Sequence, residues 1–377
     1  MAKDPLHTKI CDDLGIEVPI FGFSHCKDVV VELCNAGGVG FFGAAGHSEE
    51  DLRADINWIR ERIGKKPFGV DLIFPASMPE AQATWGELKT KVPPEYWEFM
   101  KGVKEELKIP DRKPIRGPRP DNGKHGSTDK DTMGITLEAS RKRAQVLMDM
   151  KVPLFAAGLG SPAYIMDALH AAGVKVFSLI GSLRQAKRVA ESGADYVIAQ
   201  GYDSSGHTGE IGTFSIVPQV VDAVYPTPVL AAGGICSGRQ MVAALAMGAV
   251  GVWTGTIWLP TRESGHLMVQ KQALLDATAA DTVRTRVWSG KPGRFLRNAF
   301  TNAWEKPNAP KPLPMPYQIA VINEVVEAAF DYERVDIMRN EANQSVGLIK
   351  EMKTVRQTVF DLVDEAQATL DRMGFSA

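Results

Sequence analysis

The stretch VKVFSLIGSLRQAKRVAESGADYVIAQG, residues 174–201, contains the repeating unit from which the fold is predicted. It begins with an apolar run over residues 174–179, continues with a helical pattern over 183–192 and ends in a second apolar run over 196–200. Two strands joined by a helix are typical of a parallel sheet, because a parallel connection must cross back over the sheet.

The same alternation recurs along the chain and predicts eight strands. Their ranges are 18–22, 39–44, 67–74, 152–156, 174–179, 196–200, 229–232 and 251–254. Eight such units that close on themselves form an α/β fold, the (β/α)8 TIM barrel, which takes about 250 residues. The alternative is an open doubly wound sheet. That fold normally carries Gly-x-Gly-x-x-Gly after its first strand, and Gly22-Phe-Ser does not match the motif.

Two segments depart from the alternation. Residues 75–131 form a long insertion after the third predicted strand, and residues 262–377 form a helical C-terminal extension. We expect the extension to pack on the barrel, so that residues 1–377 make a single domain. The insertion is interpreted either as a solvated loop or as a lid over the site, because long loops at strand ends are often functional.

Composition excludes several classes of protein. The formal net charge of −2 provides no basic field for nucleic acid or an anionic membrane. The apolar runs fall short of the ~20 residues that a membrane span needs, and the polar stretch 1–15 does not resemble a signal peptide. The four cysteines form no Cys-x-x-Cys pair, and histidines and carboxylates are not grouped at the spacing of metal ligands. We therefore expect a cytoplasmic protein without a metal site.

The loop after the sixth predicted strand contains the strongest catalytic candidate. Catalysis in a barrel takes place in the loops that follow the C-terminal ends of the strands. His207 lies in such a loop, between Gly201 and Gly209, with no apolar helix face to bury it. Imidazole has a pKa of about 6.5, so it can accept or donate a proton at neutral pH. Asp203 is a candidate to orient His207, and capping of the loop is the equal alternative.

Two glycine-containing loops follow the seventh and eighth predicted strands. The first contains the pair Gly233-Gly234 before a helix that opens near Ser237, and the second ends in Gly255-Thr256. Free backbone N–H groups at a helix start favour phosphate, and barrels frequently bind phosphate at these two loops. We expect a phosphate site there. Cys236, at the same helix start, is either activated by it or simply buried.

These residues resemble the nitronate monooxygenase family of FMN-dependent barrels. The family loop typically reads Ala-Gln-Gly-x-Glu-Ala-Gly-Gly-His-x-Gly, and residues 199–209 read AQGYDSSGHTG. The resemblance covers most of residues 18–259 and returns at 343–349. It implies FMN as the cofactor and His207 as the catalytic histidine. The residues implied to contact FMN are Gly22, Phe23, Asp71, Gln200, Gly201, Gly206, Gly233, Gly234, Gly255 and Thr256.

Three positions depart from the family pattern. Asp71 stands where asparagine is usual, Asp203 replaces glutamate and Trp253 sits where glutamine is frequent. A carboxylate in place of an amide near FMN would alter the charge felt by the reduced flavin. The fold and the cofactor tolerate these differences, but the substrate does not follow from the resemblance.

The leading functional hypothesis is a nitronate monooxygenase, which converts a small alkyl nitronate and O2 to a carbonyl compound and nitrite. His207 would remove a proton from a nitroalkane or stabilise the bound anion. The alternative is a reductase that uses NAD(P)H to reduce a quinone or an enoyl thioester, with Arg112, Arg116 and Arg119 suited to coenzyme A. A third hypothesis is a sensor of a phosphorylated ligand. His25 is retained as a substrate-side candidate, and pairing into a homodimer is left open.

Overall fold

The computed structural model describes residues 5–74, 84–111 and 136–375. Eight parallel strands close into a barrel in the order β1-β2-β3-β4-β5-β6-β8-β9, and β9 pairs with β1 to complete the ring. The strands are β1 (Ile20–Ser24), β2 (Val39–Gly43), β3 (Gly69–Ile73), β4 (Leu154–Gly158), β5 (Lys175–Ile180), β6 (Tyr196–Gln200), β8 (Val229–Ala232) and β9 (Gly251–Thr254). The predicted TIM barrel is confirmed.

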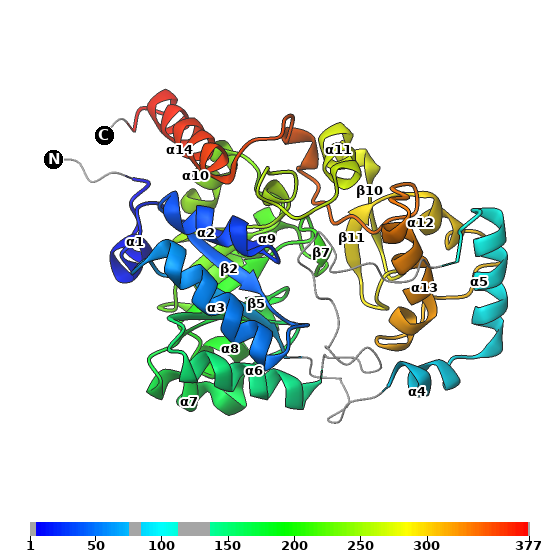
Figure 1. Ribbon diagram of the computed structural model, residues 1–377. Coiled ribbons are helices and arrows are strands. Elements are labelled where there is room, and N and C mark those ends of the chain that lie inside the picture. Colours follow the sequence, from blue (N-terminus) through cyan, green and yellow to red (C-terminus); the bar gives the residue numbers. More distant parts are fainter. Residues whose placement is uncertain (1–4, 75–83, 112–135, 376–377) are drawn as a thin grey trace.

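The barrel and the helices that surround it form one end of the molecule (Figure 1). These helices are α2 (Lys27–Asn35), α3 (Glu49–Ile63), α6 (Leu137–Asp149), α7 (Met166–Ala171), α8 (Leu183–Glu191), α9 (Thr213–Val224) and α10 (Gly238–Ala246). The start of α3 is the one expected from sequence, since the Ser48 hydroxyl accepts a hydrogen bond from the Asp51 N–H. Its buried isoleucines, at 56, 59 and 63, then pack with the outer face of β2 and β3.

Aromatic side chains fill the barrel. Phe21, Phe41, Phe177 and Trp253 belong to one buried cluster in its interior. A short helix that the sequence pattern did not predict, α1 (Lys9–Leu14), adds buried side chains to this cluster. The hydroxyl of Thr8, just before α1, donates to the carbonyl of Val250, just before β9, so α1 covers the N-terminal end of the barrel. The opposite end, where the strands terminate, is called the mouth below.

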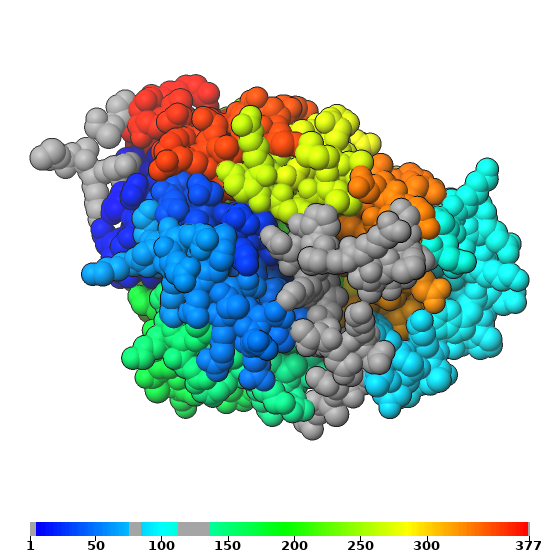
Figure 2. All heavy atoms as spheres, viewed as in Figure 1, coloured from blue at the N-terminus to red at the C-terminus, as the bar shows by residue number. Residues whose placement is uncertain are grey.

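A second hydrophobic core lies beside the barrel, in a region that we call the outer lobe (residues 84–111 and 282–338). Its elements are α4 (Trp85–Thr90), α5 (Pro94–Glu106), β10 (Thr282–Thr285), β11 (Gly293–Leu296), α12 (Ala299–Ala303) and α13 (Tyr317–Asp331). In Figure 2 the cyan atoms of the described insertion and the orange atoms of the C-terminal extension form one end of the molecule. The extension therefore contains two strands in addition to the predicted helices.

The two regions share a small antiparallel sheet. Strand β7 (Gly206–His207) leaves the loop after β6 and pairs with β11, so that His207 lies opposite Gly293. The remaining helices, α11 (Met268–Asp276) and α14 (Val355–Arg372), follow the barrel and the outer lobe in the chain, and α14 packs closely on α10. No helix of the described ranges has the length and apolar character to cross a membrane.

Of the insertion, the described part packs on α13 in the outer lobe. Residues 75–83 and 112–131 lie outside the described residues, and so do Arg112, Arg116, Arg119 and His125. The interpretation of this segment as a lid therefore stays a prediction.

Candidate active site at the barrel mouth

The loop after β6 enters the mouth through a close contact. A Cβ atom on Gly201 would lie 2.0 Å from the Thr213 hydroxyl oxygen, so only glycine fits there. The Gly201 N–H donates to the carbonyl of Ala232 at 2.9 Å, which joins the ends of β6 and β8. The loop is thereby fixed at its base, and its outer part is free to reach the outer lobe at β7.

His207 is held by a turn from the outer lobe. Its Nε2 atom lies 2.8 Å from the hydroxyl oxygen of Ser289. The next residue, Thr208, donates its N–H to the carbonyl of Pro292. Ser289 is not among the residues predicted from sequence. The signal for it was a turn sequence, Ser-Gly-Lys-Pro-Gly over residues 289–293, in which Gly290 adopts a φ of +83°.

The surroundings keep the imidazole neutral. Burial, with a smaller contribution from the charges of Lys291 and Arg339, lowers the pKa of His207 to about 4, and Glu341 acts in the opposite direction. At pH 7 His207 is therefore uncharged and carries one free nitrogen lone pair. Nε2 faces Ser289, and Nδ1 makes no hydrogen bond within the described part of the chain.

Asp203 lies in the same loop but serves a different element. Its Oδ2 atom accepts a hydrogen bond from the Thr213 N–H at 2.7 Å, at the first residue of α9. Its carbonyl accepts from the Gln344 N–H. The sequence left two roles open for Asp203, to orient His207 or to cap the loop. In the structure its carboxylate caps the loop and the start of α9, and Ser289 is the residue that contacts His207.

The predicted phosphate loops lie side by side at the ends of β8 and β9. Gly233 and Gly234 both have positive φ, +108° and +66°, which turns the backbone sharply before α10. Gly255 precedes a short 3-10 helix over Thr256–Trp258. Among the described residues, the backbone N–H groups of Gly233, Gly234, Gly255 and Thr256 donate to no acceptor. Such unpaired N–H groups suit a phosphate, so the donor set fits the phosphate end of FMN.

The C-terminal extension closes this cradle from outside. The Gln240 side chain donates to the carbonyl of Gly234 and to the hydroxyl of Ser345. The Asn343 N–H donates to the Thr256 hydroxyl at 3.1 Å. Cys236 is buried against Asn343, and burial raises the pKa of its thiol to about 12. Of the two interpretations of Cys236, the buried one therefore holds, and its thiol remains protonated at neutral pH.

The wall of the mouth combines aromatic and unpaired polar side chains. The ring of Phe23 stacks near Trp253 with 6.5 Å between centroids. Asp71 lies between Gly43 and Ala156 of the neighbouring strands, and burial raises its pKa to about 8. Neither Asp71 nor Gln200 has a side-chain partner within the described residues. A flat, partly polar ring such as that of a flavin fits this lining.

Gly22 contributes to the mouth only through its backbone. A Cβ atom at this position would lie 2.3 Å from a methyl group of Leu33 in α2 and 2.8 Å from the Trp258 ring nitrogen. The position that a side chain of residue 22 would take therefore faces the helix layer and is already filled. The following residue, Phe23, faces the mouth instead.

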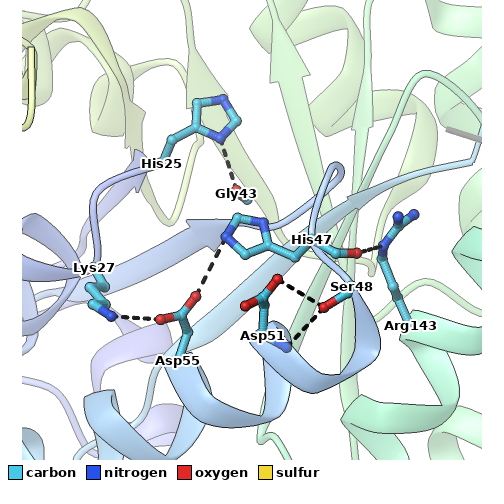
Figure 3. Close-up of polar contacts among 8 residues, drawn as sticks. All are labelled: His25, Lys27, Gly43, His47, Ser48, Asp51, Asp55 and Arg143. Carbon is cyan, nitrogen blue, oxygen red and sulfur yellow. Dashed lines mark hydrogen bonds and ion pairs between the residues drawn. The ribbon is translucent and has the colours of Figure 1, made fainter. Parts of the chain in front are cut away.

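Two further histidines lie at the ends of β1 and β2 (Figure 3). The Nδ1 atom of His25 donates to the Gly43 carbonyl at 2.8 Å. Burial lowers the pKa of His47 to about 4, and its Nε2 lies 3.5 Å from Asp55, which also pairs with Lys27 at 2.6 Å. This network joins α2 to α3 and gives His47 a structural role, whereas His25 borders the mouth.

No group of histidine, cysteine and carboxylate side chains in the described residues could hold a metal ion. The candidate site consists of a cradle of backbone N–H groups on the barrel side and of His207, which Ser289 of the outer lobe holds.

Comparisons with known proteins agree with this geometry. A sequence model of the nitronate monooxygenase family matches residues 15–365. A Mycobacterium tuberculosis protein named "Putative monooxygenase Rv1533" is 37% identical over 384 residues, which cover 98% of each chain. The nitroalkane oxidase of Streptomyces ansochromogenes aligns with a TM-score of 0.78 and 27% identity over 98% of this chain and 100% of that one.

FabK from Thermotoga maritima aligns with a TM-score of 0.72 and 28% identity, over 97% of this chain and 98% of that one. A Staphylococcus haemolyticus protein named "Probable nitronate monooxygenase" is 29% identical over 86% of this chain and 87% of its own. With its family match, its barrel and its histidine at the mouth, the chain is an oxidoreductase that belongs to the nitronate monooxygenase family.

Proposed function

We propose that this protein is an FMN-dependent nitronate monooxygenase that converts small alkyl nitronates and O2 to a carbonyl compound and nitrite. The observation that carries the proposal is His207, a neutral imidazole at the barrel mouth, fixed by Ser289 at 2.8 Å. The family match and the name of the Streptomyces neighbour support the same substrate class.

FMN would be held by the residues that fit it. Gly233, Gly234, Gly255 and Thr256 supply unpaired N–H groups for its phosphate. The ring side of the site consists of the backbone at Gly22 and the residues Phe23, Asp71, Gln200, Gly201 and Gly206. When bound, the cofactor supplies the electron-accepting ring that no side chain of this chain can replace.

His207 would contact the substrate through one nitrogen of its ring. Nε2 is hydrogen-bonded to the Ser289 hydroxyl, so Nδ1 is the atom that would contact the substrate. Nδ1 would accept a proton from the carbon of a nitroalkane or donate a hydrogen bond to the substrate anion. A base with a pKa of about 4 removes a carbon-bound proton poorly. The site therefore favours a substrate that arrives already deprotonated, a nitronate, over the neutral nitroalkane.

The test is anaerobic stopped-flow absorbance of the purified, flavin-containing protein. We expect propionate 3-nitronate to bleach the flavin absorbance and nitrite to appear once air is admitted. Bleaching by NADH or NADPH with no response to nitronate would reject this function in favour of the reductase. The coenzyme A version of that alternative depends on Arg112, Arg116 and Arg119, which lie outside the described residues.

A further inference from the structure

We propose that the turn at residues 289–293 forms an anion subsite beside His207, with the side-chain ammonium of Lys291 as its positive charge. The inference deepens the proposed function, on which it rests for the identity of the reaction. In this proposal Lys291 recognises the negative charge of the substrate. Lys291 belongs to no motif that the sequence pattern singled out.

The position of Lys291 is fixed by the same contacts that hold the histidine. Its backbone N–H donates to the Ser289 hydroxyl oxygen at 3.3 Å, and this oxygen lies 2.8 Å from His207 Nε2. Two residues later Gly293 pairs with His207 across β7 and β11. The turn thus binds the histidine at both ends, and Lys291 lies between the two attachments.

Three charged groups act on His207, namely Lys291, Arg339 and Glu341, and among the described residues two of them pair with each other. Arg339 and Glu341 form an ion pair at 2.8 Å, so their charges offset each other. Burial lowers the pKa of His266 to about 4, as it does for His207, and neither ring is charged at neutral pH. Of the charged groups that act on His207, Lys291 therefore supplies the unbalanced positive charge.

Within the part of the chain that the structure describes, Lys291 is an unpaired cation. Within the described residues, no carboxylate lies within 4.0 Å of its ammonium, whereas Lys353 is paired with both Glu351 and Asp361. The Lys291 side chain is partly buried, and that burial lowers its pKa. A partly desolvated ammonium without a partner is unfavourable, and a bound anion supplies the missing charge.

The consequence is selectivity by charge. A neutral imidazole can accept or donate a hydrogen bond but cannot balance a negative substrate. Lys291 does so, which favours a nitronate over a neutral nitroalkane, quinone or thioester carbonyl of similar size. Lys291 would thus recognise the charge of the substrate, and His207 would form a hydrogen bond to it.

The test uses two probes of the same shape, acetate and acetamide, which differ in charge. Their binding to the flavin-containing protein is measured by titration calorimetry in wild type, K291M and K291R, with K187M as the control. Lys187 is exposed on α8, so K187M removes an equal charge away from the mouth. We expect K291M to weaken acetate binding about ten- to hundredfold, in line with the loss of a charge-assisted contact. Acetamide binding should not change, and K291R should retain most of the acetate affinity.

A second measurement guards against local misfolding of K291M. Loss of the nearby positive charge should raise the pKa of His207, followed by NMR of its imidazole, in K291M but not in K187M. Equal acetate affinity in K291M and K187M, with an unmoved His207 pKa, overturns the proposal.

The two proposals fail separately. A protein that binds acetate through Lys291 and does not oxidise nitronates retains the subsite and loses the proposed function. If K291M oxidises nitronates with an unchanged KM, the proposed function is retained and the anion subsite is rejected.

Discussion

The two sides of the site are built from different chemical groups. The barrel side presents backbone N–H groups of Gly233, Gly234, Gly255 and Thr256, and its geometry follows from glycine conformations. The outer-lobe side presents the side chains of Ser289 and Lys291, which act on or beside His207. Backbone groups suit a cofactor whose phosphate is always the same, and side chains suit the part of the site that sets the reaction and its substrate. Variants on each side should therefore separate cofactor binding from turnover.

The largest effect is expected where the two sides meet. H207A should lower kcat/KM for a nitronate by about 10²- to 10³-fold, the usual cost of removing one positioned group that stabilises an anion. Flavin content should stay at the wild-type level, because the phosphate cradle does not include the histidine. Steady-state nitrite release and the flavin absorbance spectrum check both points. H170A, at an exposed histidine paired with Asp195, is the matched control. Flavin loss in H207A would contradict the division.

A variant of the barrel side should have the opposite signature. In G233A the new Cβ atom would lie 2.6 Å from the Thr213 hydroxyl, in a backbone conformation with φ of +108°. We expect the Kd for FMN to rise about ten- to hundredfold, because strain of this kind costs about 1–3 kcal/mol. Flavin fluorescence during reconstitution measures it. G102A serves as the control, since a Cβ atom on Gly102 in α5 meets no neighbour. Unchanged affinity in G233A would show that the cradle does not hold the phosphate.

Ser289 should affect turnover without affecting the cofactor. S289A removes the hydroxyl that fixes His207 Nε2, so we expect kcat to fall about tenfold while the Kd for FMN is unchanged. S289T keeps the hydroxyl and should restore most of kcat. Failure of S289T to recover activity, or an equal loss in both variants, would indicate a packing role for Ser289 instead of a positioning one.

The smallest effect concerns the buried carboxyl group of Asp71. Because its pKa is raised from 3.8 to about 8, the folded state retains a proton that the unfolded state loses between these values. Its contribution to the free energy of unfolding therefore falls as the pH rises through this window. D71N removes the penalty, so the cofactor-free variant should gain about 2 °C in Tm at pH 9 and less at pH 5. Differential scanning fluorimetry checks the difference, and an equal gain at both pH values would refute it.

The barrel could be predicted because the sequence patterns that specify each of its strands and helices lie within those elements. Each strand and helix has its own apolar period, and the loops at the strand ends are adjacent in sequence to the strands that position them. The same locality made His207, Gly233-Gly234 and Gly255-Thr256 candidates for the site. Asp203 could not be resolved by this reasoning, since the loop gives no indication that its carboxylate reaches the first N–H of α9.

The outer-lobe half could not be predicted for the opposite reason. Ser289 lies 82 residues after His207, in a turn that follows no period, and the two meet only through tertiary structure. Strands β10 and β11 are four residues each, too short to stand out within an extension expected to be helical. A turn rich in glycine and proline predicts where the chain bends, but not which distant side chain it will contact.

The pairing of β7 with β11 also sets the order in which a newly made chain becomes competent. A ribosome completes all eight barrel strands by Thr254, when the residues that hold His207 have not yet been translated. At that point the chain also lacks Gly255 and Thr256 of the cradle, and Asn343 and Ser345, which close it. Both halves of the site are therefore complete only after the C-terminal extension has been translated, so a product terminated after the last barrel strand would have neither the full cradle nor an anchored His207.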